Sequence, residues 1–446
     1  MTTMGKTMSA YYDAEAETAS PQRIQEIQFR KLRKILDWVS NSNPFYKRKL
    51  QDHRIDIEEI QDLHDLEKLP FSTKEEFQLD QEKTPPFGTN LSEPLDHFIR
   101  YHQTTGTKGK PLRWLETKES WQWRRRLAAT ALWAAGVRPS DISFFPFSFG
   151  PHVAFWGLFE GAQELGALAI AGGGWDTLQR VQFIMDNKVT VICCTPTYAL
   201  RITEVARENG IDLRDSSLRR LIQAGEPGAL VPSIRKKLIE ALGAMPYDYS
   251  GLTEVGAYGI QCQHQEQAVH VNESEFILEI IDAKTGGKTQ DGEIGEMVLT
   301  NLGRGCAPSI RFRTGDLAKL KTENCPCGRT YKMLDGGVLG RSDDMIIIRG
   351  LNIFPSQIAE VVQRHLMIGE EYQVLVYEKD GMGELKVQIE LHEGRKNEQI
   401  PRMLRNELRQ RFEIRMEVEA VSEGTLQRSD YKSKRFLDKR KEVASH

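Results

Sequence analysis

The sequence predicts an α/β protein with a large N-terminal lobe, residues 1–342, and a small, mobile α+β C-terminal lobe, residues 343–446. Helical patterns alternate with short β-branched runs between residues 117 and 223, which is typical of a parallel sheet covered by helices. From residue 275 onward, strand patterns follow one another without helices, which indicates a small β subdomain. At 446 residues, the chain is also too long for one compact core.

The elements follow from their periodicities and end signals. Apolar residues at helical spacing predict a helix over 22–40 that ends at Asn43-Pro44, and Ser72 or Thr73 can cap a second helix that opens with acids. The alternating region is expected to contain helices at 117–135, 153–165, 176–187 and 197–208, and strands at 142–149, 167–171, 189–194 and 220–223. Strands are expected next at 275–281, 295–300 and 309–314. In the small lobe we expect helices at 355–366 and 398–412, and strands at 373–377, 385–391 and 416–421.

Composition excludes several functional classes. Charged residues make up 28% of the chain and the net charge is −3, which gives no electrostatic basis for binding nucleic acid or an anionic membrane. The basic run Arg124-Arg125-Arg126 is expected on a solvated face. No apolar run reaches the ~20 residues of a membrane span and Met1–Arg23 lacks a secretory signal, so we expect a cytoplasmic protein. Six cysteines in so long a chain do not form a disulfide framework.

The stretch from Gln103 to Pro111 has the composition of an anion-binding loop. Its glycines, threonine hydroxyls and lysines can direct backbone N–H groups, hydroxyls and positive charge at a phosphate. It does not match the nucleotide-binding P-loop, because Thr104 replaces the first glycine and Pro111 the final hydroxyl residue. Gly287-Lys288-Thr289 fails the same pattern and is expected to be a turn. Taken alone, the 103–111 loop is equally compatible with a polar surface loop.

Two glycine turns follow strands of the predicted parallel sheet, where ligands of such sheets bind. They are Ala224-Gly225-Glu226-Pro227 and Ser250-Gly251-Leu252-Thr253-Glu254. Glu254 beside Thr253 is compatible with a Mg²⁺ site completed by phosphate and water, although a helix cap is the commoner role of such a pattern. Asp316 lies on a further glycine turn, where a carboxylate can accept hydrogen bonds from ribose hydroxyls.

Five motifs in this order resemble those of the adenylate-forming ligase superfamily, and most of all its phenylacetate–CoA ligase group. They are the 103–111 loop, Ala-Gly-Glu-Pro at 224–227, Gly-Leu-Thr-Glu at 251–254, Arg-Thr-Gly-Asp at 313–316 and Gly-Arg-Ser-Asp-Asp at 340–344. Further segments similar to that group are Asn43–Tyr46, Leu69–Lys74, Arg349–Pro355 and Leu426–Ser429. Each motif is weak alone, but their ordered occurrence is specific, and the resemblance covers essentially the whole chain.

The resemblance implies an ATP-dependent acid–CoA ligase that forms an acyl-adenylate and then an acyl-CoA thioester. Lys432 would bridge the attacking carboxylate and the α-phosphate, Asp343 would be the hinge of the small lobe, and Glu254 would hold Mg²⁺ with Thr253 near the α-phosphate. The residues implied to bind ATP or coenzyme A are Thr104, Thr105, Gly106, Thr107, Lys108, Gly109, Lys110, Ala224, Gly225, Glu226, Pro227, Tyr249, Ser250, Gly251, Asp316, Arg341 and Gly350.

Residues between 147 and 155, mostly aromatic, and the glycine turn at 172–174 are candidates for the pocket that binds the acid. For each of these residues, an ordinary position in the hydrophobic core is the alternative. The candidate pocket residues are Phe147, Phe149, His152, Phe155, Gly172, Gly173 and Gly174. The aromatic rings favour a flat apolar acid of the phenylacetate, benzoate or anthranilate type. Two other functions stay open: transfer of the acyl group to a carrier protein or an amine, and nucleotide binding without catalysis. The retained Lys432, Glu254 and Asp316 argue against nucleotide binding without catalysis. Whether the protein forms a homodimer also stays open.

The cysteines suggest a second metal site. Cys262, Cys325 and Cys327, with His264 or the nearby His270, can form a Cys₃His set for structural zinc. Some proteins similar to the phenylacetate–CoA ligase group carry such a site. His264 is expected to be the fourth ligand, with His270 as the alternative.

Overall fold

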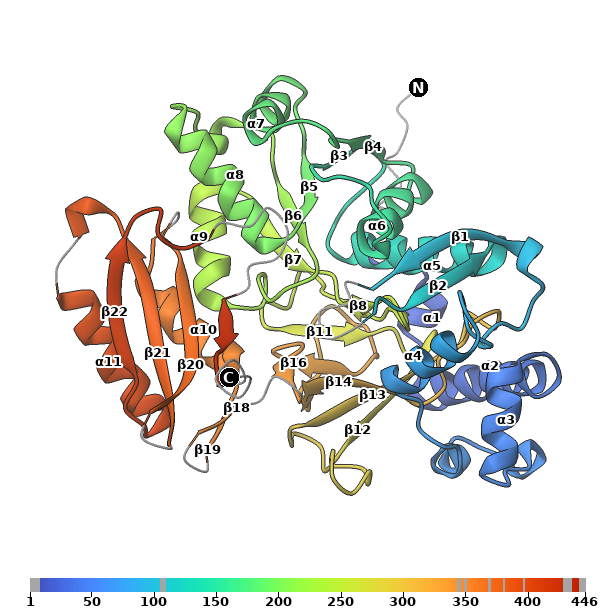
Figure 1. The fold of residues 1–446 in the computed structure, drawn as a ribbon. Coiled ribbons are helices and arrows are strands. Elements are labelled where there is room, and N and C mark those ends of the chain that lie inside the picture. The colour runs from blue at the N-terminus through green and yellow to red at the C-terminus, as the bar shows by residue number, and fades with distance from the viewer. Residues whose placement is uncertain are drawn as a thin grey trace, which may run out of the picture.

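The computed structural model describes residues 9–104, 110–342, 346–348, 351–367, 370–379, 382–395, 398–427 and 435–440. The chain forms two lobes, a large one that ends with β17 (Gly340–Arg341) and a small one that begins with β18 (Ile346–Ile348) (Figure 1). The predicted boundary between residues 342 and 343 falls in the link between these two strands, and residues 343–345 lie outside the described part.

Helices α2 (Pro21–Ser42), α3 (Pro44–Asp52) and α4 (Lys74–Lys83) form the N-terminal part of the large lobe. Asn43 ends α2, and its side chain accepts the Tyr46 N–H to cap α3. Thr73 and Glu76 form a capping box at the start of α4, which confirms the predicted cap. The short elements of this region are α1 (Ala14–Glu17) and 3₁₀ turns at Ile57–Glu59, His64–Lys68 and Leu95–His97.

A five-stranded parallel sheet of order β4-β3-β5-β6-β7 forms the centre of the large lobe and confirms the predicted α/β alternation. Its strands are β3 (Ile142–Phe145), β4 (Leu168–Ala171), β5 (Val191–Cys194), β6 (Arg220–Gln223) and β7 (Met245–Asp248). The strand predicted over 142–149 ends at Phe145, because Pro146 has no N–H to continue the ladder.

Helices cover both faces of this sheet (Figure 1). They are α5 (Lys118–Ala134) and α6 (Val153–Glu164) on one face, and α7 (Thr177–Asp186), α8 (Pro196–Glu208) and α9 (Pro232–Leu242) on the other. Successive side chains of a strand alternate between faces, so Val191 and Cys193 pack with α5 and α6 whereas Ile192 and Cys194 pack with α7 to α9. Burial on both faces explains the uninterrupted apolar run of β5.

The β subdomain consists of two antiparallel sheets beside α2. One has the order β12-β13-β14-β17, with β12 (Phe276–Ile281), β13 (Gly295–Asn301) and β14 (Phe312–Ala318). The other has the order β10-β11-β16-β15, with β10 (Gly259–Ile260), β11 (Ala268–Val271), β15 (Leu320–Lys321) and β16 (Met333–Asp335). Two hairpins complete the lobe: β1 (Phe98–Gln103) with β2 (Arg113–Thr117), and β8 (Gly251–Leu252) with β9 (Gly256–Ala257). A further 3₁₀ turn spans Leu213–Asp215.

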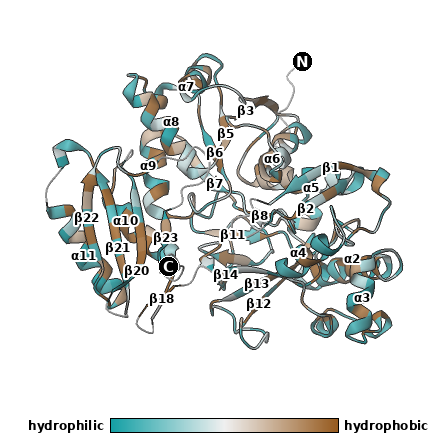
Figure 2. Ribbon diagram, viewed as in Figure 1, coloured by the Kyte–Doolittle hydropathy of each residue, from teal (hydrophilic) through white to brown (hydrophobic). Residues whose placement is uncertain are grey.

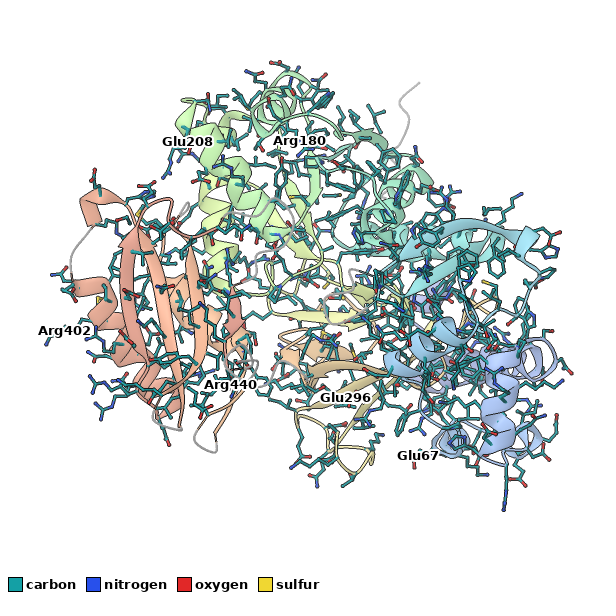
Figure 3. All side chains as sticks on the ribbon, in the orientation of Figure 1. Glu67, Arg180, Glu208, Glu296, Arg402 and Arg440 are labelled. Carbon is teal, nitrogen blue, oxygen red and sulfur yellow. The ribbon has the colours of Figure 1, made fainter. Side chains whose placement is uncertain are left out.

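In the small lobe, two helices pack on a sheet of order β22-β21-β20-β23, which is the arrangement expected of an α+β lobe. Its elements are β18, β19 (Leu351–Ile353), α10 (Pro355–His365), β20 (Tyr372–Lys379), β21 (Met382–Leu391), a 3₁₀ turn (Glu393–Arg395), α11 (Gln399–Phe412), β22 (Glu417–Ser422) and β23 (Phe436–Asp438). Hydrophobic residues concentrate on β20 and β21 (Figure 2), where Val374, Val376 and Val387 are fully buried. Charged residues such as Arg402 of α11 lie at the surface (Figure 3).

The two lobes meet where α10 packs against α9. A groove of about 870 Å³ lies at this junction and is lined by α8, α9 and the end of α10. Among the described residues, no helix combines the length and apolarity needed to cross a bilayer.

Candidate functional site

The Thr253-Glu254 motif lies at the tip of the β8–β9 hairpin, which follows the carboxyl end of β7. Gly256 closes the hairpin with φ of 126°, and a Cβ there would lie 2.9 Å from the ring of Trp123, so only glycine fits. The Glu254 side chain is 7% exposed, and its Oε1 lies 3.5 Å from Nζ of Lys74. Carboxylate oxygens are the protein ligands that Mg²⁺ uses, so Glu254 can bind this ion in competition with Lys74.

Lys74 is a neighbour of Glu254 that the sequence analysis did not single out. It is the first residue of α4, in a segment where the sequence pattern itself indicates a helix start. The capping box fixes the first turn of α4, and this places Lys74 against Glu254. The similarity of Leu69–Lys74 to the ligase group was the available signal.

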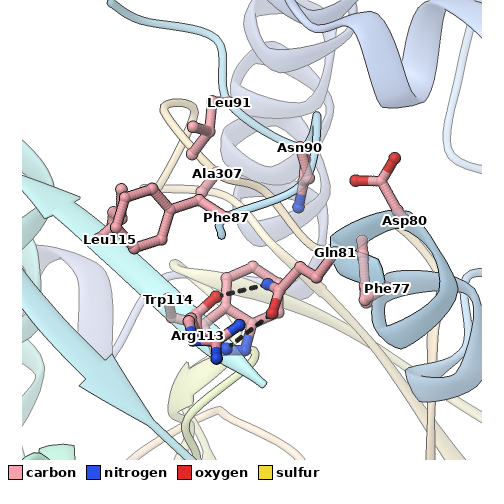
Figure 4. A pocket seen from close by; sticks show the side chains of 10 residues that line it. All are labelled: Phe77, Asp80, Gln81, Phe87, Asn90, Leu91, Arg113, Trp114, Leu115 and Ala307. Atoms are coloured by element: carbon pink, nitrogen blue, oxygen red, sulfur yellow. Dashed lines mark hydrogen bonds between the residues drawn. The ribbon is translucent and has the colours of Figure 1, made fainter. Parts of the chain in front are cut away.

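Helix α4 is attached to the hairpin that carries the 103–111 loop. The side-chain amide of Gln81 makes two hydrogen bonds with the backbone of Arg113 on β2 (Figure 4). Its Nε2 donates to the Arg113 carbonyl at 2.7 Å, and its Oε1 accepts the Arg113 N–H at 3.0 Å. Nε2 of Gln78 donates to the Lys110 carbonyl at 3.1 Å. A cavity of about 10 Å³ beside these contacts, between Phe77 and Trp114, has room for about one water molecule.

The predicted phosphate loop is the connection of the β1–β2 hairpin. At its base, Thr104 pairs with Leu112, donating its N–H to the carbonyl at 2.9 Å and accepting the Leu112 N–H on Oγ1 at 3.0 Å. Lys110 is exposed and lies 3.5 Å from Glu82. Thr105, Gly106, Thr107, Lys108 and Gly109 lie outside the described residues, as do Asp343, Gly350 and Lys432.

Asp316 and Arg341, two residues that the resemblance places at the bound nucleotide, are brought together by strand pairing. They are register partners in β14 and β17, and Nη1 of Arg341 donates to Oδ1 of Asp316 at 2.9 Å. Asp316 is buried, whereas Arg341 is partly exposed. The pair therefore offers a fixed carboxylate next to an accessible cation.

The turn at 224–227 packs on the start of α8. Ala224 is buried and Gly225 has φ of 93°, so the chain turns sharply at the end of β6. The carboxylate of Glu226 accepts the Thr197 N–H at 2.8 Å and thereby caps α8. The Glu226 side chain is therefore engaged with the first turn of α8.

The segment before the β8–β9 hairpin directs its side chains away from the tip. Tyr249 is buried in the core shared with α5 and α6, and Gly157 of α6 faces its hydroxyl. The Ser250 hydroxyl donates to the Asp248 carboxylate. Burial raises the pKa of Asp248 to about 6, against the opposing effect of the Ser250 hydrogen bond.

The candidate pocket residues gather beyond the carboxyl end of β3. The ring centroid of Phe147 lies 4.6 Å from that of Phe149 and 4.2 Å from that of Phe155. Nδ1 of His152 lies 3.3 Å from the Gln103 carbonyl, so this aromatic group adjoins the base of the 103–111 loop. The carbonyl of Gly172, in the glycine turn at 172–174, accepts a hydrogen bond from Nε of the buried Arg180 at 3.0 Å.

Comparisons with known proteins show what the chain is similar to. Residues 350–440 match the AMP-binding enzyme C-terminal domain. The chain is 32% identical to phenylacetate-coenzyme A ligase of Escherichia coli (strain K12), over 96% of this chain and 98% of that relative. It is also 32% identical to phenylacetate-coenzyme A ligase of Thermus thermophilus, over 86% of this chain and 84% of that relative. The chain belongs to the phenylacetate–coenzyme A ligase family.

The chain is accordingly an ATP-dependent, AMP-forming acid–CoA ligase. A crystal structure of 2-hydroxyisobutyryl-CoA ligase in the postadenylation state, with an acyl-AMP bound, superimposes with a TM-score of 0.92 at 27% identity, over 98% of this chain and 94% of that one. The same enzyme in the thioesterification state, with acyl-AMP and CoA, gives a TM-score of 0.74 at 28% identity, over 99% and 96%. As a whole, the ligase therefore resembles the postadenylation structure more than the thioesterification structure.

Away from the nucleotide site, the ligase brings Cys262, His270, Cys325 and Cys327 together, with their ligand atoms all within 4.8 Å of one another. The prediction of His264 as the fourth member is wrong, because His264 lies exposed in the β10–β11 connection. His270 lies on β11, which pairs with both β10 and β16 and so meets the cysteines that flank those strands.

Donor chemistry at this cluster fits a metal ion. Nδ1 of His270 lies 3.2 Å from the Tyr331 carbonyl, while its Nε2 lies 3.4 Å from Sγ of Cys327. Sγ of Cys262 and Cys325 are 3.5 Å apart, close to the about 3.8 Å separation that Zn–S bonds of about 2.3 Å give in a tetrahedron. The ring nitrogen that faces the sulfurs is thus oriented by a hydrogen bond at the other nitrogen.

Proposed function

We propose that this ligase activates an aromatic carboxylic acid. The observation that carries the proposal is the group of Phe147, Phe149 and Phe155, whose closely spaced rings adjoin the base of the 103–111 loop. Aromatic side chains bind a flat apolar ring through offset and edge contacts. The names of the Escherichia coli and Thermus thermophilus relatives support the same acid class.

In the proposed reaction, a carboxylate oxygen attacks the α-phosphorus of ATP and pyrophosphate leaves. The thiol of coenzyme A then attacks the acyl carbon, and AMP leaves. The first step joins two anions, so positive charge and hydrogen-bond donors must be in place before attack. Mg²⁺, when bound, supplies part of that charge at Glu254, and the 103–111 loop supplies the rest to the β- and γ-phosphates.

Other residues of the chain position the two substrates in this proposal. Thr253 lies near the α-phosphate, the turn at 224–227 and the Tyr249–Gly251 segment flank the adenine, and Asp316 with Arg341 binds the ribose. Lys432 contacts the attacking carboxylate, Asp343 is the hinge, and the loop at Gly350 reaches coenzyme A after the small lobe rotates. Arg341 contacts Asp316 at 2.9 Å, which supports their joint assignment.

An ATP–pyrophosphate exchange screen tests the acid class. Phenylacetate, benzoate or anthranilate is expected to support exchange about tenfold better than 2-hydroxyisobutyrate, because an apolar pocket gains little from a small polar acid. Parallel assays with coenzyme A should yield the acyl-CoA of the preferred acid. Preference for 2-hydroxyisobutyrate would overturn the aromatic assignment, and acid-dependent exchange without acyl-CoA formation would indicate a carrier protein or an amine as acceptor.

We also propose that Cys262, His270, Cys325 and Cys327 hold a structural zinc ion. The three sulfurs and one ring nitrogen fill a tetrahedral set with no position left for substrate, as in structural sites. The cluster also adjoins the N-terminal segment, because the Tyr11 hydroxyl donates to the Cys327 carbonyl at 2.8 Å. Metal binding would therefore stabilise the attachment of this segment.

Metal analysis of matched histidine variants tests the zinc site. The purified protein is expected to contain about one zinc ion per chain, as a closed four-ligand site requires. His270→Ala should lose the zinc and lower the Tm, whereas His264→Ala should keep both, because His264 lies outside the cluster. Absence of zinc from the wild-type protein, or equal loss in both variants, would contradict the site.

A further inference from the structure

Three charged residues are buried beneath the β8–β9 hairpin. Glu116 of β2 and Arg304 of the β13–β14 connection are both 0% exposed, and Arg124 of α5 is buried beside them. The prediction that Arg124-Arg125-Arg126 lies on a solvated face is therefore wrong for Arg124. Charged side chains are almost never fully buried unless they are paired, so this cluster requires an explanation.

Contacts from this cluster end on the backbone of Thr253 and Glu254. Both guanidinium groups donate to Oε1 of Glu116, Arg304 at 3.1 Å and Arg124 through a shorter contact. They also donate to the Thr253 carbonyl, Arg124 at 2.7 Å and Arg304 at 3.3 Å, and Arg304 donates to the Glu254 carbonyl as well.

Two neighbouring side chains complete this set of donors. The Ser309 hydroxyl donates to the Glu254 carbonyl at 2.7 Å, and Nδ2 of Asn301 donates to the Val255 carbonyl at 3.1 Å. The carbonyls of three successive residues, Thr253, Glu254 and Val255, thus point into the protein. Because C=O and N–H lie on opposite sides of a planar trans peptide, the N–H groups of Glu254 and Val255 face the other way.

We propose that Glu116, Arg124 and Arg304 are positioning residues that fix the hairpin tip, so that the Glu254 carboxylate is held in place for Mg²⁺–ATP. The cluster also joins two parts of the site, since Glu116 lies on the strand that follows the 103–111 loop. This inference rests on the proposed role of Glu254 as the Mg²⁺ ligand.

Electrostatics supports a positioning role over a purely stabilising one. Although burial raises the pKa of Glu116, the adjacent Arg124 and Arg304 outweigh it and lower this pKa to about 2. The cluster therefore carries one negative and two positive charges beneath the hairpin. A buried ion cluster is often no more stabilising than apolar residues of the same volume, so stability alone does not account for it.

Arg304→Lys is the decisive variant, because a lysine keeps the charge but replaces the planar fork, whose Nη1 and Nη2 reach separate acceptors, by a single ammonium nitrogen. We expect the Mg²⁺ concentration for half-maximal ATP–pyrophosphate exchange to rise about tenfold or more, as for residues that orient a metal ligand. Thioester formation from a supplied acyl-adenylate should stay within about threefold of wild type, since pyrophosphate has already left. Ser309→Ala removes a single donor and should show a smaller rise of the same kind without loss of folding.

Glu279→Gln is the matched control. Glu279 pairs with Arg311 at 2.7 Å in another largely buried ion pair that does not contact the hairpin carbonyls. This variant should lower the Tm and leave the Mg²⁺ dependence unchanged. Wild-type Mg²⁺ dependence in both Arg304→Lys and Ser309→Ala would overturn the positioning role, provided that Glu254→Gln shifts it. If Glu254→Gln also leaves it unchanged, the proposed Mg²⁺ role of Glu254 fails first.

Discussion

Lys432→Ala is expected to abolish acyl-adenylate formation while sparing thioester formation from a supplied acyl-adenylate. In the proposed mechanism, the ammonium group contacts the carboxylate and the α-phosphate only in the first step. Removal of one preorganised charge at a reacting centre costs about 100-fold to 1,000-fold in rate. ATP–pyrophosphate exchange measures the first half-reaction, and release of AMP from the acyl-adenylate in the presence of coenzyme A measures the second.

Lys439→Ala serves as the control for this experiment. Lys439 is an exposed lysine of the same lobe, and its backbone N–H donates to the Val376 carbonyl at 2.8 Å, a contact that alanine retains. Both half-reactions should proceed at the wild-type rate in this variant. An equal loss of both half-reactions in Lys432→Ala would show that Lys432 supports folding or general binding instead of adenylation.

Most of the fold could be predicted because hydrophobic periodicity determines it locally. The parallel sheet, the β subdomain and the α+β lobe follow from the order of short β-branched runs and amphipathic helices. Helix α9 was not predicted, although Pro232 at its first position and Gly243 in the left-handed conformation after its end are ordinary helix signals. The strand predicted at 309–314 lies at 312–318, because end positions depend on pairing with β13 and not on composition.

Prediction of the candidate site was less complete, because its residues depend on contacts across the chain. Sequence motifs identified Glu254, Asp316 and Arg341, although Asp316 and Arg341 lie in paired strands and not in the turns that their glycines suggest. The local patterns indicate a helix start at Lys74 and a solvated basic run at Arg124, and neither pattern reveals the contact that the residue makes. Neither sequence spacing nor composition distinguishes a buried arginine that pairs with a distant glutamate from an exposed one. The choice of His264 over His270 failed for the same reason, since strand pairing brings the more distant residue to the cysteines.

Glu254→Gln is expected to lower the rate of adenylation by about 100-fold or more and to raise the Mg²⁺ concentration that the reaction requires. An amide keeps the size of the side chain but loses the negative charge that a hard divalent cation prefers. The backbone contacts of Glu254 with Arg304 and Ser309 do not involve the side chain, so the hairpin should keep its conformation. Exchange rates across a Mg²⁺ titration measure both effects.

Lys74→Met separates metal binding from the ion pair at this carboxylate. Lys74 lies 3.5 Å from Glu254, and its side chain is 37% exposed, so the pair itself should contribute little to stability. If Glu254 acts only as the partner of Lys74, the two variants should lose the same activity and keep the wild-type Mg²⁺ dependence. If Glu254 binds the metal, only Glu254→Gln should raise the Mg²⁺ requirement strongly, because Lys74→Met leaves the carboxylate in place. Removal of the Lys74 ammonium group should strengthen Mg²⁺ binding, because the metal no longer competes with this group for the same carboxylate oxygen.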